Sequence, residues 1–166
     1  SQSRGLGYVY KRQVDSIALP KLQKANMNGV MGSVMTQFWA PDLDTPQNKK
    51  FVSGFKKKYG RYPSFYAAQS YDTIFLIKSA VEAVKGDLSN KDGMRAAMEK
   101  ANFPSVRGKF SYGNNHFPIQ NFYSREVVKD SDGVWTTSVR EVVLKNHQDT
   151  YACLLYTSDA ADERNS

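Results

Sequence analysis

The hydrophobic pattern predicts one long helix in the middle of the chain. The range 62–86 is apolar on most sides, and one polar stripe at helical spacing interrupts it. The stripe consists of Lys78, Glu82 and Lys85. Pro63 disfavours helix in the residue before it, Ser64 is suited to cap a helix N-terminus, and Gly86 is suited to close the other end. We therefore expect a core helix with a narrow solvent-exposed edge.

A second, amphipathic helix is predicted just before it. Thr45 and Pro46 form an N-cap and first-position pair, and aromatic residues then recur every four positions up to Gly60. These aromatic residues are Phe51, Phe55 and Tyr59. The other face carries Lys49, Lys50, Lys56, Lys57 and Lys58. A solvated lysine face is favoured over a nucleic-acid interface, because no arginine–aromatic interleaving or binding motif accompanies the lysines.

The flanking segments predict shorter elements. The range 14–25 is expected to be a loop or short helix broken near Pro20, and the range 29–38 a short buried strand. Ser89 and Asp92 resemble a capping box that would begin a third helix. Two β-rich runs, 120–129 and 134–144, flank an Asp-Ser-Asp-Gly turn and predict a β-hairpin. This order indicates an α/β fold with a late antiparallel element.

Both ends of the chain are interpreted as translated sequencing adapter. Residues 153–163 read CLLYTSDAADE and residues 9–13 read VYKRQ, and these two peptides can be encoded by the two strands of one adapter. We therefore assign 1–13 and 153–166 to adapter-derived tails, the alternative being two natural tails, and exclude them from fold reasoning. The remaining segment stays basic and loses the only cysteine, so it is expected to have no disulfide or thiol chemistry.

The sequence gives little support for catalysis or metal binding. His116 and His147 have no histidine or cysteine partner at metal-ligand spacing, and the Asp130-x-Asp132-Gly133 motif fits a hairpin turn better than a calcium loop. No phosphate-binding loop, nucleophile elbow or dinucleotide fingerprint is present, and no apolar run reaches transmembrane length. We expect a non-enzymatic protein without metal or cofactor.

Four segments together carry a resemblance to a known family. They are TQFWAPDLDTPQNKKF, KKYGRYPSFYAAQSYDT, VRGKFSYGNNHFPIQNFYSREVVKDSDG and NHQDTYA. In order and spacing they resemble the C-terminal part of the branched-chain amino acid (Leu/Ile/Val-binding) substrate-binding proteins of ABC transporters, the type I periplasmic binding proteins. The resemblance implies a partial fold of this type, with 14–106 as the remnant of a Rossmann-like lobe. Residues 107–152 would be the hinge crossing and the C-terminal β-hairpin of the other lobe.

The resemblance also implies a function. Such proteins close two lobes on a small ligand and present it to permease subunits in the membrane, in the periplasm or on a lipid anchor outside the cell. Amino acids, amides and aromatic carboxylates are the candidate ligands, and the aromatic content here favours an aromatic or large apolar one. A ligand-sensing receptor or regulatory domain of the same fold is the alternative. Because the segment matches only the final third of such a chain, half of the cleft would be missing.

The resemblance places five residues at the cleft. Gln37, Phe38 and Trp39 follow the predicted strand, and Phe65 and Tyr66 begin the long helix. Tyr66 is the first choice, because its hydroxyl could orient a ligand while its ring stacks on it. Packing within the lobe is the alternative for the aromatic residues.

Two charged residues are expected to have structural roles. Asp72 is predicted to be a hydrogen-bond acceptor within the lobe. Arg107, which precedes Gly108, is expected to line a hinge or to pair with an acidic neighbour.

Overall fold

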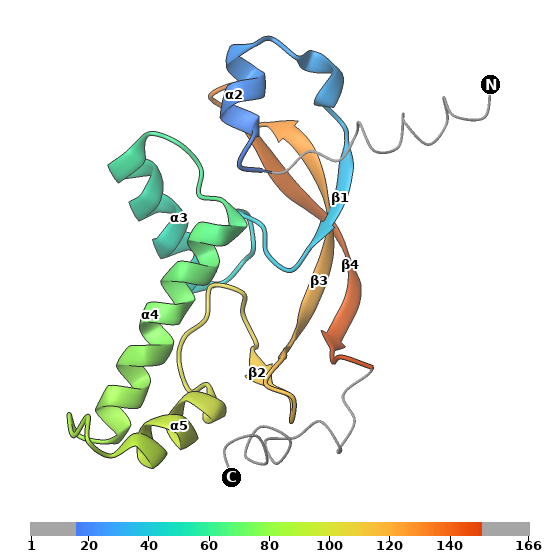
Figure 1. The fold of residues 1–166 in the computed structure, drawn as a ribbon. Helices are drawn as coiled ribbons and strands as arrows, with labels where there is room; N and C mark the ends of the chain where they lie inside the picture. The colour runs from blue at the N-terminus through green and yellow to red at the C-terminus, as the bar shows by residue number, and fades with distance from the viewer. Residues whose placement is uncertain (1–15, 151–166) are drawn as a thin grey trace.

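The computed structural model describes residues 16–150, in which three helices, α3, α4 and α5, lie on one side of a long twisted β-ribbon and a fourth, α2, lies at one end of it (Figure 1). The elements in chain order are α2 (Leu19–Lys24), the 3-10 helix η1 (Asn28–Val30), β1 (Val34–Gln37), α3 (Pro46–Tyr59), α4 (Phe65–Ala83), α5 (Lys91–Lys100), β2 (Ser111–Tyr112), β3 (Pro118–Lys129) and β4 (Trp135–His147). The ranges 1–13 and 153–166, which are predicted to be adapter-derived, lie wholly outside the described residues. The structure is thus a mixed helix and strand fold, as the sequence predicted.

Strand β3 is the centre of the described sheet. It pairs antiparallel with β4 along most of its length, with β1 from Val34 opposite Glu126 to Gln37 opposite Tyr123, and with the short β2. The hairpin between β3 and β4 is confirmed. Its turn is held by Asp130, whose Oδ1 accepts the backbone N–H groups of Asp132 and Val134 at 2.9 and 2.8 Å.

The predicted start and end of α3 and the predicted start of α4 are confirmed, whereas α4 ends at Ala83 with Val84 as its C-cap, before the predicted Gly86. The Thr45 hydroxyl accepts the backbone N–H of Asn48, Pro46 is the first helical residue of α3, and Gly60 closes that helix at φ +64°. Ser64 caps α4 through the N–H of Ala67 at 3.4 Å. These signals are local, because each is either a side chain that accepts a backbone N–H in the first turn of its helix or a glycine at the end of the helix.

Three predicted shorter elements are present, namely a short helix within 14–25, a strand within 29–38 and a helix after Ser89, but each differs from the prediction in its limits or cap. Pro20 lies in the first turn of α2 and so begins that helix instead of breaking it. The predicted strand 29–38 is a strand only at Val34–Gln37, and its residues alternate between exposed and half-buried. Asn90, not Ser89, caps α5, because the Asn90 side chain accepts the N–H of Gly93 while the Ser89 hydroxyl donates to Asp87.

The prediction that α4 is a core helix was also wrong for its outer face. Ile74 is 65% exposed and Ile77 is 44% exposed. Ile74 lines an open groove between α3 and α4, with a volume of about 820 Å³, so no described element covers that side of the helix. The polar stripe is confirmed by the exposed ion pair between Lys78 and Glu82 at 3.5 Å. No helix within residues 16–150 is long and apolar enough to cross a membrane.

The described chain has two hydrophobic cores. The first, which we call the helical core, contains Trp39, Ala40, Leu43, Phe51, Val52, Ala68, Val106 and Tyr123. The second, the hairpin core, contains Leu19, Val127 and Trp135, with Leu22, Val30, Met31 and Met35 packed against it. Gln23 fastens α2 to the hairpin, because its side chain bonds the carbonyl of Gly133 and the N–H of Trp135, both at 2.9 Å. Helix α2 therefore packs with the hairpin.

Candidate ligand-binding site

The N-terminal end of α4 carries a small aromatic surface. The rings of Phe38 and Phe65 meet edge to face with centroids 5.9 Å apart, and the rings of Phe65 and Tyr66 lie 4.0 Å apart. Tyr66 is 54% exposed, whereas Phe38 and Phe65 are half-buried. The structure thus brings together three of the five predicted site residues, from the β1–α3 connection and the first turn of α4.

Gln37 lies at the end of β1, next to this surface in the chain. Its side-chain Oε1 accepts the backbone N–H of Phe38 at 3.2 Å, so this amide oxygen is bonded to the next residue in the chain. The Gln37 side chain therefore helps to fix the backbone where the chain leaves the sheet for α3.

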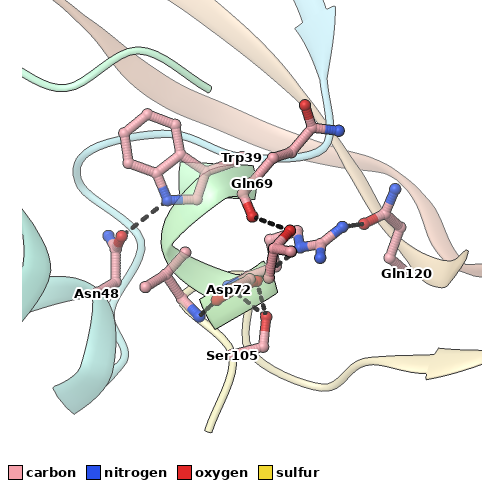
Figure 2. A network of polar contacts seen from close by, with 9 residues as sticks. Trp39, Asn48, Gln69, Asp72, Ser105 and Gln120 are labelled. Carbon is pink, nitrogen blue, oxygen red and sulfur yellow. Dashed lines mark hydrogen bonds and ion pairs between the residues drawn. The ribbon is translucent and has the colours of Figure 1, made fainter. Parts of the chain in front are cut away.

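Trp39 is placed inside the helical core. Its side chain has no exposed surface, and its indole N–H donates to Asn48 Oδ1 at 2.8 Å (Figure 2). The Asn48 amide in turn donates to the backbone carbonyls of Ala40, Pro41 and Leu43 at 3.1–3.3 Å. Trp39 offers no surface to a ligand in this conformation, so the structure shows the packing role that was weighed for it.

A buried polar network lies directly beneath the aromatic surface. Asp72 on α4 accepts three hydrogen bonds, from the Ser105 hydroxyl at 2.6 Å, the Val106 N–H at 2.9 Å and Arg107 Nε at 2.9 Å (Figure 2). Arg107 also donates to Gln120 Oε1 on β3 at 3.0 Å. The predicted acceptor role of Asp72 and the pairing of Arg107 with an acidic neighbour are both confirmed.

The sequence analysis missed Ser105 and Gln120 as members of this network. They are 5% and 6% exposed, and they bond partners 33 and 13 positions away in the chain. Such bonds depend on where β3 lies against α4, and no periodic pattern in the sequence records that position. The one available signal was the Arg107-Gly108 pair between a helix and a predicted strand.

The network links the aromatic surface to the sheet. The Arg107 guanidinium carbon lies 5.5 Å from the ring centroid of Phe38 and 4.1 Å from that of Phe110. Arginine is well suited to this position, because a planar guanidinium can stack on aromatic faces while it donates hydrogen bonds in its own plane. The position of Phe38, and through it Phe65, thus depends on a side chain that is also bonded to α4 and β3.

The chemistry available at this site is that of recognition. Exposed aromatic rings can stack on a flat or apolar ligand, and the start of a helix carries a partial positive charge that favours an anionic group. Among residues 16–150, no three or more His, Cys, Asp or Glu side chains are placed to hold a metal ion. His116 is instead near Glu99, with Nε2 and Oε1 3.4 Å apart.

Comparison with known proteins identifies the class. A sequence profile described as periplasmic binding protein matches residues 3–133, and the chain belongs to this family. The matched range begins inside the N-terminal segment predicted to be adapter-derived, and the origin of that segment stays a prediction. The helices and the strands β1, β2 and β3 described above therefore lie within the range that matches this family.

Individual relatives sharpen the comparison. The Leu/Ile/Val-binding protein homolog 6 of Brucella abortus is 34% identical over 110 residues, which are 63% of this chain and 27% of that protein. A solute-binding protein of an ABC transporter from R. palustris, solved in complex with benzoate, is 30% identical with a TM-score of 0.65, over 80% of this chain and 36% of that one. A second, from Rhodopseudomonas palustris in complex with p-hydroxybenzoic acid, is 29% identical with a TM-score of 0.65, over 82% and 36%. The chain thus spans about a third or less of the length of these relatives.

Proposed function

We propose that this chain is part of the ligand-capturing component of an ABC importer. In this role the protein holds a small ligand between two lobes outside the cytoplasmic membrane and delivers it to permease subunits, without catalysing a reaction. Membership of the periplasmic binding protein family supports the role and the periplasmic or extracellular location. The ABC transporter solute-binding proteins of similar structure support the same transport role.

The proposed ligand is a small carboxylate with an aromatic or large apolar body. The observation that carries this proposal is the surface formed by Phe38, Phe65 and Tyr66 at the start of α4. Rings at 4.0–5.9 Å provide an apolar wall, and the start of α4 favours a negative charge. Two structural relatives were solved with benzoate and p-hydroxybenzoic acid, which have this chemistry. A Leu/Ile/Val-binding homologue supports an amino acid as the competing ligand.

Replacement of Tyr66 tests the site. In the parent protein that carries this sequence together with the rest of the two lobes, Tyr66→Ala is expected to weaken binding of benzoate or 4-hydroxybenzoate about 5- to 150-fold, because the loss of an aromatic contact buried by the ligand costs about 1–3 kcal/mol. Tyr66→Phe is expected to have a smaller effect, because the ring is retained. Isothermal titration calorimetry with benzoate, 4-hydroxybenzoate and leucine measures both.

The matched control is Tyr59→Ala. Tyr59 is 53% exposed, nearly the same as Tyr66, but it lies at the end of α3 and stacks on Phe55. Its removal is expected to leave affinity unchanged. Equal affinity of Tyr66→Ala and the unaltered protein for every ligand that binds would contradict the proposed role of Tyr66.

A further inference from the structure

The two hydrophobic cores are separated by a seam that packing leaves partly open. The helical core and the hairpin core are separate clusters, and cavities of about 250 and 440 Å³ lie between the elements that form them. The smaller cavity is lined from the hairpin side by Trp135 and from the other side by the connection between α3 and α4. The larger lies between α3 and the hairpin, with Lys56 and Thr136 among its lining residues. Hydrophobic packing therefore does not fill the space between the cores.

One polar cluster crosses this seam. The Tyr62 hydroxyl donates to Asp130 Oδ2 at 2.8 Å, and Lys56 Nζ lies 3.4 Å from the same oxygen. The Lys56 ammonium also lies 4.2 Å from the centroid of the Tyr62 ring. Lys56 belongs to α3, Tyr62 to the α3–α4 connection and Asp130 to the hairpin turn. We call these three residues the seam bridge.

Asp130 has two separate tasks in this arrangement. Its Oδ1 accepts the N–H groups of Asp132 and Val134 and so shapes the turn, while its Oδ2 reaches across to Tyr62 and Lys56. The hairpin turn is therefore rigidly attached to the carboxylate that makes the bridge. Movement of the hairpin relative to α3 must stretch or break the bonds at Oδ2.

A second polar contact lies further along the same seam. Asp42, in the β1–α3 connection, accepts the Ser138 hydroxyl at 2.6 Å and the Val139 N–H at 3.0 Å. This contact lies close to the point where β1 leaves the sheet, whereas the seam bridge lies at the far end of the hairpin. The contact at Asp42 is thus near the part of β3 that pairs with β1, and the bridge lies beyond the C-terminal end of β3.

We propose that Lys56, Tyr62 and Asp130 act as a releasable cross-link that sets the angle between the helical core and the hairpin core. The bridge is suited to release, because the side chains of Lys56 and Asp130 keep 35% and 13% of their surface exposed and water can replace their bonds. Tyr62 lies three residues before Phe65, so the same cross-link positions the start of α4. Any effect of the cross-link on ligand capture rests on the proposed function, whereas its effect on the angle between the two cores does not.

The charge states of Asp130 and Tyr62 favour the hydrogen bond between them. Burial opposes ionisation of Asp130, but hydrogen bonds from Val134, Tyr62 and Asp132 together with Lys56 lower its pKa below the ordinary value. Tyr62 has a raised pKa, first because of its burial, so its hydroxyl keeps the proton that it donates. The bridge is therefore formed in the charge states that all three residues hold at neutral pH.

Electron spin resonance distance measurements on this chain test the cross-link without any ligand. Spin labels are attached at Ala83→Cys on the far end of α4 and at Ser131→Cys in the hairpin turn, with the native Cys153 changed to serine. Both labelled positions are exposed and neither belongs to the bridge. We expect Tyr62→Phe and Asp130→Asn to add a second population of distances, with a roughly fivefold change in the population ratio for one lost hydrogen bond.

Matched variants separate this role from a merely structural one. Asp132→Asn removes the same charge from the same exposed turn without touching the bridge, and it is expected to leave the distances unchanged. A lower melting temperature for Tyr62→Phe and Asp130→Asn with unchanged distances would overturn the proposal. Failure of the protein to bind benzoate or leucine would count against the proposed function alone, because no ligand enters this measurement.

Discussion

Two polar junctions connect the helices to the two ends of β3, and they differ chiefly in burial. At the beginning of the strand, Gln120 bonds Arg107, which is paired with Asp72, and the side chains of this ion pair are only 8% and 1% exposed. Beyond its end, Asp130 meets Lys56 and Tyr62, and here the ion pair is 35% and 13% exposed on the lysine and aspartate sides. Each junction thus pairs a basic side chain with an aspartate, but one pair is buried and the other is partly exposed.

This difference in burial indicates which junction is rigid and which can open. A buried pair is costly to break, because the remaining charge is left without water or a partner. A partly exposed pair can exchange its bonds for bonds to water at little net cost. We therefore regard the junction at Asp72 as the fixed point of the molecule and the seam bridge as its adjustable point. The predictions below test this contrast.

The largest effect is expected from Asp72→Ala. This change leaves Arg107 buried without its carboxylate and removes the acceptor for Ser105 and Val106, so it should lower the free energy of unfolding by about 3–5 kcal/mol. Urea denaturation followed by circular dichroism measures it. The control is Asp92→Ala, because Asp92 pairs with Arg95 on the surface of α5 and should contribute no more than about 0.5 kcal/mol. Equal effects of the two changes would refute the contrast.

A smaller effect is expected from Tyr62→Phe. The phenyl ring keeps its contact with the Lys56 ammonium, and only the hydrogen bond to Asp130 is lost, so the free energy of unfolding should fall by about 1 kcal/mol. Tyr59→Phe serves as the control, since it removes a hydroxyl from an exposed tyrosine of the same helical layer. A loss as large as that of Asp72→Ala would show that the seam bridge is as fixed as the buried junction.

The smallest effect is expected from acid. Because the pKa of Asp130 in the folded protein lies below its unfolded value, its contribution is complete above the unfolded pKa and disappears as the pH falls through the folded one, that is, below about pH 4. Asp44, bonded to Lys49, and Asp87, bonded to Ser89, also have lowered pKa values and add to the same acid limb. Asp130→Asn should therefore reduce, but not abolish, the loss of stability between pH 5 and pH 2 in thermal melts. An unchanged slope would contradict this assignment.

What the sequence predicted well depends on neighbours in the chain. The Thr45-Pro46 start of α3, the Ser64 cap of α4 and the Asp130–Gly133 turn each act over four residues or fewer, and all are confirmed. The error at Ser89 shows the limit of such signals. Asn90 stands beside Ser89 and is an equally good cap, and the pattern alone could not choose between them.

What the sequence predicted poorly depends on partners far away. The exposed Ile74 of α4 was expected in the core, because an apolar residue in a helix does not reveal whether anything covers it. Trp39 was given two roles, and its burial against Asn48 was decided by the turn between β1 and α3. The aromatic surface could be proposed from the resemblance, but the network of Asp72, Ser105 and Gln120 beneath it required the fold.

The pairing of β1 with β3 has a consequence for synthesis of the protein. Val34 pairs with Glu126, a residue about ninety positions later, so β1 leaves the ribosome long before its partner exists. At roughly 5–20 residues per second, that wait lasts about 5–20 s. During this time α3, α4 and α5 can form from their own local signals, whereas β1 cannot yet pair with β3. The pairing of β1 with β3 is thus completed only after the helices between them have been made.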